Sequence, residues 1–313
     1  MPHPLSQHPS PDFSILHVSD THLLGGSKPL HGTIDTSRRI DEMFHRIRSS
    51  TLDIRALVFT GDLADRAEVD AYQELKDLVE PHAQALSAEV IWVMGNHDER
   101  EPFSTVMWGE EATSDPRDRS YDIDGLRIIA LDTSVPEYHH GELTDAQMEW
   151  LSQELAQPAP RGTLLALHHP PIPTIVPLMG LIELDDQQRL WDAVKGSDVR
   201  GILAGHLHYS THTVYQGIPV SVAAAACYNI DLAADSSLLL KGVDRAHASS
   251  LVSVYAEQLV FSDIPAIDMP ELFSHSAEYL PMIEQMDPAA RRAMFSAKNS
   301  EFNRQVDKDQ AGE

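Results

Sequence analysis

Short runs of apolar residues recur along the chain, and each is the length of a buried β-strand. The runs that predict strands are 13–19, 54–60, 90–94, 126–131, 163–167 and 199–204. Between them, apolar residues spaced three or four positions apart predict helices with one buried face. These helices are expected over 33–50, over 68–86, from 144 onward and over 187–194, with Pro81 breaking the second.

Strands that alternate with helices are typical of a layered α/β core. Shorter alternating runs, at 211–215, 219–222, 251–255 and 258–264, add further strands. We therefore expect an α/β fold in which two packed β-sheets are flanked by helices, a four-layer α-β-β-α sandwich built from two βαβαβ-like halves.

Composition divides the chain into three parts. Residues 1–12 are rich in proline and have no periodic pattern, so we expect a flexible leader. Residues 13–264 contain no linker and form one domain, whereas 265–313 form a helical extension and a polar tail from Gln305. Asp287 and Pro288 are typical of a helix start, and this helix is expected to run to about Phe302. Four apolar residues of this C-terminal part could dock it on the domain or on a second subunit: Met282, Met286, Met294 and Phe295.

Net charge, cysteine content and the length of the apolar runs together disfavour several classes of protein. Twenty-three basic and 48 acidic residues give a formal net charge of −25, which disfavours polymeric nucleic acid as a partner. Cys227 is the single cysteine of the 313 residues and fits a reducing cytoplasm. No apolar run reaches about 18 residues, and no signal peptide is recognisable, so we expect a cytoplasmic protein with no membrane span.

Polar clusters follow five of the predicted strands. They are Asp20 with His22, Asp62, Asn96 with His97, His168, and His206 with His208. Because the carboxyl ends of parallel strands share one rim of an α/β sheet, these side chains can converge although they lie far apart in the chain.

The chemistry of the clustered side chains points to metal ions. Carboxylates, imidazoles and an amide oxygen without a thiolate suit first-row metals such as Mn, Fe, Co or Zn. A lone histidine at a strand end is more often structural. Seven candidate ligands at strand ends, however, can hold two ions if one carboxylate binds both. Asp62 is the candidate for this bridging carboxylate. Two neighbouring divalent ions can generate a hydroxide nucleophile and clamp the oxygens of a phosphoryl group.

The motifs around these residues resemble the five-block signature of calcineurin-like metallophosphoesterases. The blocks are Asp20-x-His22, Gly61-Asp62-Leu63-Ala64-Asp65, Gly95-Asn96-His97-Asp98, His168-His169 and Gly205-His206-Leu207-His208. The surrounding sequence is most similar to bacterial class III 3′,5′-cyclic nucleotide phosphodiesterases of the actinobacterial type, from about Ile15 to Ile264.

The resemblance implies two metal sites, an iron–manganese pair with Mn, Co or Zn as alternatives, and a homodimer. One ion would be held by Asp20, His22, Asp62 and His208. The second would be held by Asp62, Asn96, His168 and His206.

The resemblance also implies catalytic roles. His97 would contact the phosphate and protonate the leaving oxygen, and Asn96 would both bind metal and touch a phosphate oxygen. Asp65 would orient His97 or cap the next helix, and both alternatives stay open. His208 is a further candidate for substrate contact, as is His140, which lies beside His139 in a loop that could equally be solvated.

The activity implied is hydrolysis of 3′,5′-cyclic AMP, and of cyclic GMP, to the 5′-monophosphate by attack of a metal-bridging hydroxide. The same chemistry would serve 2′,3′-cyclic nucleotides, glycerophosphodiesters or nucleic-acid ends, and this alternative stays open. An alternative of another class is a non-catalytic metal-binding scaffold, which would be free to lose some of the motif residues.

Overall fold

The computed structural model describes residues 5–244, 248–265 and 270–305. The chain divides into two compact units, of which the larger runs from Pro11 to Asp268 and the smaller combines residues 1–10 with 269–313. Of the polar tail expected from Gln305, residues 306–313 lie outside the described residues, as do residues 1–4 of the expected leader.

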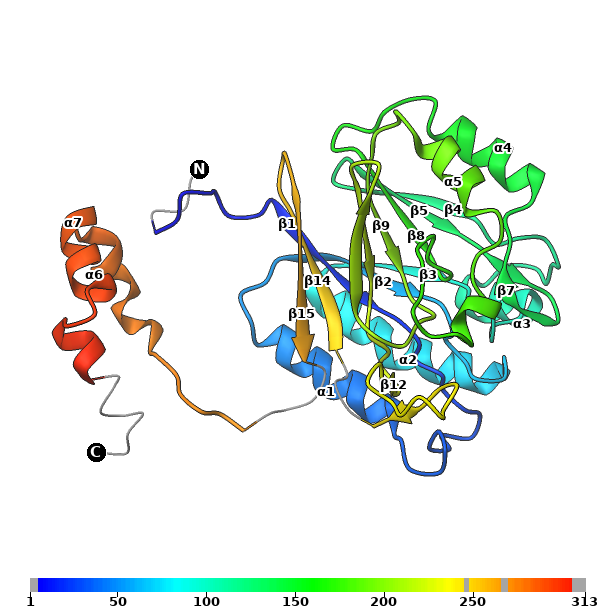
Figure 1. Cartoon of the computed structure of the whole chain (residues 1–313), viewed down its shortest axis with the longest axis horizontal. Coiled ribbons are helices and arrows are strands. Elements are labelled where there is room, and N and C mark those ends of the chain that lie inside the picture. Colours follow the sequence, from blue (N-terminus) through cyan, green and yellow to red (C-terminus); the bar gives the residue numbers. More distant parts are fainter. Residues whose placement is uncertain (1–4, 245–247, 266–269, 306–313) are drawn as a thin grey trace. The chain divides into compact units, whose positions relative to one another are not determined.

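The larger unit contains two main β-sheets (Figure 1). The first sheet has the strand order β15-β14-β1-β2-β3. Its strands are β1 (Phe13–Val18), β2 (Ile54–Thr60), β3 (Glu89–Val93), β14 (Ala248–Val254) and β15 (Leu259–Pro265). Strands β1, β2 and β3 are parallel, whereas β14 is antiparallel to both β1 and β15.

The second sheet has the order β10-β11-β9-β8-β5-β4. Its strands are β4 (Arg119–Ile123), β5 (Leu126–Leu131), β8 (Thr163–Leu167), β9 (Val199–Ala204), β10 (Thr211–Tyr215) and β11 (Ile218–Val222). The four central strands are parallel, and an antiparallel strand pairs at each edge.

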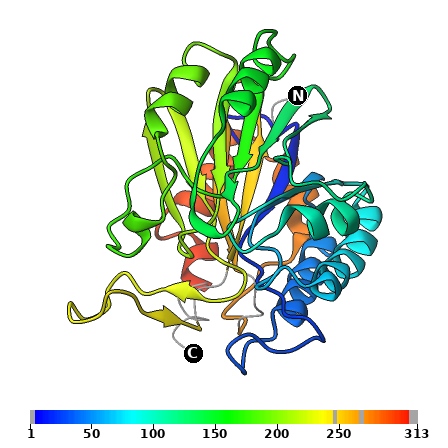
Figure 2. The same ribbon diagram turned by 90° about the vertical axis from the view of Figure 1, so that its right-hand side faces the viewer.

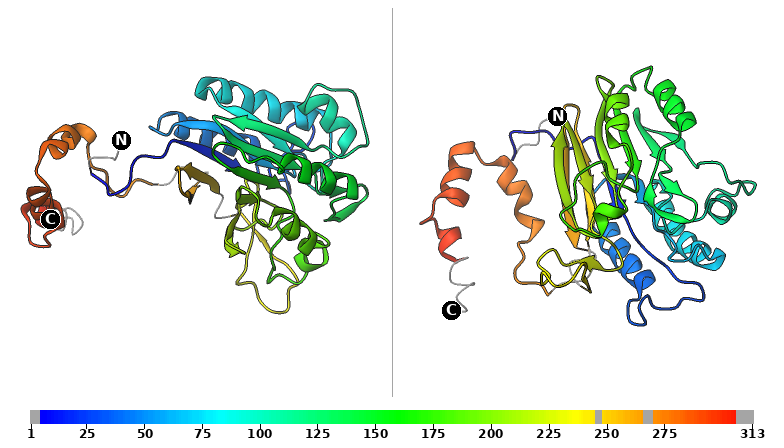
Figure 3. Two further views of the ribbon diagram at one scale, coloured as in Figure 1. Left: turned by 90° about the horizontal axis from the view of Figure 1, so that it is seen from above. Right: turned by 45° about the vertical axis from the view of Figure 1, so that its right-hand side comes forward.

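Helices cover the outer face of each sheet (Figure 3). The first sheet carries α1 (Thr36–Arg48), α2 (Val69–Leu86) and α3 (Arg100–Met107), and the second carries α4 (Asp145–Glu154) and α5 (Gln187–Val194). The predicted arrangement, two packed sheets flanked by helices, is confirmed.

The strands have both faces buried, which explains their nearly continuous apolar sequences. Ile15 and Val58 of the first sheet belong to the core between the sheets, together with Leu164 of the second sheet. Their chain neighbours Leu16 and Leu57 point the other way, toward the helices. Alternation along each strand therefore fills two cores rather than one.

Local signals set the helix starts. Asp35 accepts a hydrogen bond from Arg38 N at the start of α1, and Thr144 with Gln147 forms the predicted capping box of α4. The predicted break at Pro81 is wrong, because α2 continues to Leu86. The apolar face of α2 stays buried beyond the proline, so packing outweighs the lost backbone hydrogen bond.

Several elements carried no clear sequence pattern. They include α3, β4, and two small hairpins, β6 (Ser134–Val135) with β7 (Tyr138–Gly141) and β12 (Asn229–Ile230) with β13 (Gly242–Val243). Figure 2 shows β12, β13 and the loop that joins them, in yellow. These pieces are short or partly exposed, so they show no long apolar period.

The smaller unit contains α6 (Leu280–Gln285) and α7 (Pro288–Arg291). Asp287 caps α7 as expected. The prediction of a single helix to Phe302 is wrong, because α7 passes into a π-helical turn over Arg292–Ser296 and the helical winding then ends at Ala297, whose backbone is extended. The ring of Phe295 then packs against that of Phe302, 4.9 Å away, so the chain turns back on itself. Among the residues described, no helix is both long and apolar enough to cross a membrane.

Replacing Gly205 by alanine is expected to lower the free energy of unfolding by about 1–3 kcal/mol. A Cβ at this position would overlap Ser19 Oγ and lie 2.8 Å from Asp20 Oδ2, so the segments that follow β1 and β9 would have to separate. Denaturant unfolding of the metal-free protein measures the loss. Gly180→Ala is the control, because its Cβ would meet only Thr174 Cγ2 at 3.8 Å; equal stability of the two variants would contradict the prediction.

Candidate metal centre

The structure gathers the predicted polar clusters at one edge shared by the two sheets. Asp20 and His22 follow β1, Asp62 follows β2, and Asn96 with His97 follows β3. His168 follows β8, and His206 with His208 follows β9, so the second sheet contributes to the same site. Hydrogen bonds join the two sets, since Asp20 accepts from His206 N at 3.1 Å.

The backbone at this edge is unusual. Five of the candidate metal ligands have positive φ angles between 45° and 69°, which residues with a Cβ adopt infrequently: Asp20, His22, Asp62, His206 and His208. Gly95 allows the β3 loop to approach Asp62, because a Cβ there would overlap the backbone N and Oδ1 of Asp62. Strain of this kind persists where the surroundings enforce it, and it is typical of functional sites.

The first group of candidate ligands consists of Asp20, His22, Asp62 and His208, whose ligand atoms lie within 4.8 Å of one another. His22 Nε2 is 3.3 Å from Asp62 Oδ2 and 3.2 Å from His208 Nε2. His208 Nε2 is also 3.3 Å from Asp20 Oδ1. Ligand atoms bound at about 2.0–2.2 Å around one ion have separations of this size.

The second group joins the first through Asp62. His168 Nε2 lies 3.3 Å from the same oxygen, Asp62 Oδ2, and 3.1 Å from Asn96 Oδ1. His206 lies beside His168, with ligand atoms within 4.8 Å and ring centroids 5.0 Å apart. One oxygen of Asp62 thus faces both groups, which is the geometry of a bridging ligand.

Each candidate histidine ligand has one ring nitrogen held by an acceptor outside the cluster. The pairs are His22 Nδ1 with Asp65 Oδ1 (3.0 Å), His168 Nδ1 with Thr60 O (2.7 Å), His206 Nε2 with Ile182 O (2.8 Å) and His208 Nδ1 with Tyr228 O (3.0 Å). An oxygen acceptor requires the proton on that nitrogen, so in the neutral ring it is the opposite nitrogen that carries the lone pair for a metal. Metal-binding histidines in proteins are oriented in this way.

Burial makes positive charge necessary at this site. Asp20 and Asp62 are almost completely buried. Burial alone would raise their pKa values, but His208 lowers the pKa of Asp20 to about 2, and His168 holds that of Asp62 well below its usual range. The same contacts overcome burial to raise the pKa of His208 and His22 to about 10 and that of His168 to about 9.

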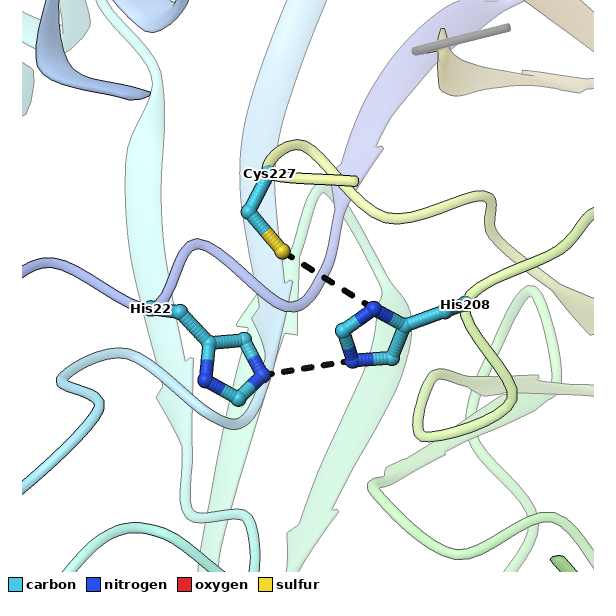
Figure 4. A group of neighbouring side chains, drawn as sticks. All are labelled: His22, His208 and Cys227. Carbon is cyan, nitrogen blue, oxygen red and sulfur yellow. Dashed lines mark hydrogen bonds between the residues drawn. The ribbon is translucent and has the colours of Figure 1, made fainter. Parts of the chain in front are cut away.

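The donor set therefore fits two divalent ions. Cys227 lies close to it, but its Sγ is 3.8 Å from His208 Nδ1, the nitrogen opposite the one that meets Asp20 and His22 (Figure 4). Its Sγ lies within 4.8 Å of ligand atoms of His22 and His208, but burial raises the pKa of this thiol and so disfavours the thiolate that a metal would need. The ligands that remain are nitrogen and oxygen atoms, which suit Mn, Fe, Co or Zn.

His97 lies at the margin of the cluster, with its ring 4.7 Å from that of His22. Its Nδ1 donates to the backbone oxygen of Asp65 at 2.8 Å, which leaves Nε2 available to a substrate. The side chain of Asp65 binds His22 instead and is 3.9 Å from His97 Nδ1. Asp65 does not cap the next helix, because α2 begins at Val69 with Glu68 as its N-cap.

His139 and His140, the two histidines of the 134–141 hairpin, contact different parts of the structure. His140 faces Asp185, 3.9 Å away, and its ring lies near Tyr138. His139 instead bonds to Asn96, with Nδ1 2.9 Å from Asn96 Nδ2, and its ring is 5.2 Å from that of His97. The structure thus puts His139, rather than His140, against the candidate substrate contacts.

Asp98 is a supporting residue that the sequence patterns did not single out. Its buried carboxylate accepts hydrogen bonds from the backbone N of Leu63, Ala64 and Gly95 and from the hydroxyl of Tyr72. It therefore ties the loop of Asp62 to the loop of Asn96. Its place as the last residue of the Gly95-Asn96-His97-Asp98 block was the available signal.

Known proteins resemble the chain across this region. A family model described as calcineurin-like phosphoesterase matches residues 13–210. A cAMP/cGMP dual specificity phosphodiesterase of Mycobacterium tuberculosis is 51% identical over 260 residues, covering 83% of this chain and 81% of that protein. The CpdA 3′,5′-cyclic adenosine monophosphate phosphodiesterase of Pseudomonas aeruginosa is 31% identical over 206 residues, covering 65% and 73%.

Among solved structures, a dimetal phosphatase from Danio rerio superposes with a TM-score of 0.59 at 14% identity. The match covers 83% of this chain and 98% of that one. At this identity the similarity establishes a common fold.

Removing the shared carboxylate is expected to empty both metal positions. Loaded with Mn²⁺ in a zinc-free buffer, the protein should contain two ions per chain, His206→Ala one, and Asp62→Asn none that survives gel filtration, because Asp62 Oδ2 faces both groups. Elemental analysis by mass spectrometry measures the content. His140→Gln is the control and should keep two ions; two ions retained by Asp62→Asn would refute the bridge.

Metal loading is expected to release protons at pH 7, up to three per chain from the histidine ligands. The pKa values of His22, His168 and His208 lie above 7, so these rings carry a positive charge when no metal is bound. A ring must lose the proton on its ligand nitrogen before that nitrogen can coordinate a metal ion. The release should decline as pH rises toward 10. Calorimetric titrations in buffers of different ionisation enthalpy count the protons, and a buffer-independent heat at pH 7 would show the prediction to be wrong.

Proposed function

The chain belongs to the calcineurin-like phosphoesterase family, and from that premise we propose that it hydrolyses 3′,5′-cyclic AMP and cyclic GMP to the 5′-monophosphates. The residues that support this are the seven side chains at the shared edge of the sheets. The observation that carries the proposal is the position of Asp62 Oδ2, 3.3 Å from both His22 Nε2 and His168 Nε2.

We propose that one ion is held by Asp20, His22, Asp62 and His208, and the other by Asp62, Asn96, His168 and His206. When bound, two divalent ions activate a water nucleophile and stabilise charge that develops on the phosphoryl oxygens. An iron–manganese pair is the expected content, and the nitrogen and oxygen ligands support a first-row pair of this kind.

The protein side chains then position the substrate and complete proton transfer. The Nδ2 of Asn96 carries hydrogens that can meet a phosphoryl oxygen, while its Oδ1 stays on the side of His168. His97, held at Nδ1 by the Asp65 carbonyl, presents Nε2 to the substrate. Ring opening of a cyclic nucleotide expels the O3′ alkoxide, so a proton from Nε2 of His97, in the form of the ring that carries protons on both nitrogens, lowers the barrier and leaves the neutral ring.

The choice of substrate is supported by two observations. The relative at 51% identity is named a cAMP/cGMP phosphodiesterase. The net charge of −25 disfavours long nucleic acids, whereas a small anion can enter a site made locally positive by its ions. His139 lies against Asn96 and is the hairpin residue placed to contact such a ligand.

Three further features belong to the proposal. Residues 13–264 would be the phosphoesterase domain. The resemblance to class III phosphodiesterases supports a homodimer, which sedimentation equilibrium tests. The single cysteine supports a cytoplasmic location, which fractionation of the source cells tests.

The proposed activity is tested by steady-state hydrolysis of 3′,5′-cAMP with Mn²⁺, beside 2′,3′-cAMP and a generic aryl phosphodiester. We expect kcat/KM for 3′,5′-cAMP to equal or exceed that for the other two. Much faster cleavage of 2′,3′-cAMP and the aryl diester would keep the diesterase chemistry and overturn the assigned substrate.

The role of His97 is tested through the leaving group. His97→Ala is expected to lower kcat for 3′,5′-cAMP by about 10²–10⁴ without changing the metal content. The loss should be much smaller for p-nitrophenyl diesters, because nitrophenolate departs without a proton. An equal loss on both substrates would argue against proton donation. Glu101→Gln, an exposed change on α3, is the control and should keep full activity.

A further inference from the structure

A second cluster of metal-ligating side chains lies on the helical face of the first sheet, and we propose that it is a separate zinc site. It consists of Asp41 and His45 on α1 and His82 on α2. One ligand atom from each residue lies within 4.8 Å of the others. None of the three belongs to the family motifs or to the dinuclear centre.

The distances suit a single ion. His82 Nε2 is 2.9 Å from Asp41 Oδ1, and His45 Nε2 is 3.5 Å from Asp41 Oδ2. Ligand atoms bound to tetrahedral Zn²⁺ at about 2.0–2.1 Å lie about 3.3–3.4 Å apart, so small side-chain rotations bring the three into place. Two imidazoles and one carboxylate are a set that zinc accepts, with water as the fourth ligand.

The backbone and the core already hold two of the ligands in position. Asp41 and His45 are four residues apart on α1, so their side chains lie on the same face of the helix. His82 is buried, and its ring stacks on that of Phe44 at 4.8 Å with an interplanar angle of 12°. Only His45, which is largely exposed, has to be ordered when the ion binds.

The metal-free arrangement holds His82 by one hydrogen bond and its stacking contact. Its Nε2 bonds to Asp41 Oδ1 at 2.9 Å, whereas its Nδ1 is buried without a hydrogen-bond partner among the described residues, so Nε2 is the atom that would bind the ion. The protein is strongly acidic overall, which favours the approach of a cation. A divalent ion would replace a single hydrogen bond at His82 by a coordinate bond.

An ion at this position would join α1 to α2. The segment before α1 carries Asp20 and His22, and the segment before α2 carries Asp62 and Asp65. The zinc ion would therefore link α1 and α2, the helices that follow Asp20, His22 and Asp62. It would share no ligand with the dinuclear centre. We assign it a stabilising role, independent of the phosphodiesterase chemistry.

The experiment counts metal in the full chain. The protein is dialysed against a buffer with low-micromolar free Zn²⁺, and its total metal is measured by mass spectrometry. Wild type should hold three ions per chain and His45→Gln two, with phosphodiesterase activity unchanged. Glu42→Gln, an exposed change on the same helix, should hold three. Two ions in wild type, or three in His45→Gln, would overturn the proposal.

Thermal unfolding gives a second measurement. With the dinuclear centre already loaded, Zn²⁺ at about 100 times its dissociation constant should raise the Tm of wild type by about 5 °C. Glu42→Gln should show the same rise and His45→Gln none. A rise of equal size in His45→Gln would locate the stabilising ion elsewhere and refute the assignment.

Discussion

The need to neutralise two buried carboxylates governs the organisation of this protein. Asp20 and Asp62 are removed from water at the edge where the two sheets meet. A buried carboxylate is costly unless it is paired, so positive charge must be delivered to the same place. The histidines that surround these carboxylates come from both sheets, and their outer nitrogens are held by oxygen acceptors.

The same constraint explains how the two halves of the sandwich are joined. Thr60, the last residue of β2, offers its backbone oxygen to His168 and to the hydroxyl of Ser19, while its own hydroxyl meets His17. Within the second sheet, Gly205 N donates to His168 O. The hydrogen bond that orients His168 is a contact between the sheets, as is the bond from His206 N to Asp20, so the site and the fold share these interactions.

Much of the architecture could be predicted from the sequence, because strands buried on both faces must be apolar along their length. The clusters after β1, β2, β3, β8 and β9 were recognisable for the related reason that metal chemistry needs particular side chains at strand ends. Features set by tertiary contacts were not accessible in this way. Pro81 remains helical because packing continues past it, and the choice between His139 and His140 depends on the twist of a short hairpin.

Asp65 is a further case in which the sequence identifies a residue but not the contacts of its individual atoms. The motif places it near His97, but only the three-dimensional structure shows that its backbone holds His97 while its carboxylate holds His22. The motif likewise contains Asp98, but its role was hidden, because a carboxylate that accepts three backbone hydrogen bonds has no periodic signature. Roles that depend on the backbone cannot be inferred from side-chain identity.

The pairing of His22 with His208 has a consequence for the order of folding. These residues are 186 positions apart, so the centre is complete only when nearly two thirds of the chain has been synthesised and both sheets have docked. Contacts of such long sequence separation form slowly, since the entropy of closing the loop must be overcome first. The complete centre therefore forms only after residue 208 has been translated, and until an ion binds, the charge of Asp20 and Asp62 is balanced by the rings of His22, His168 and His208.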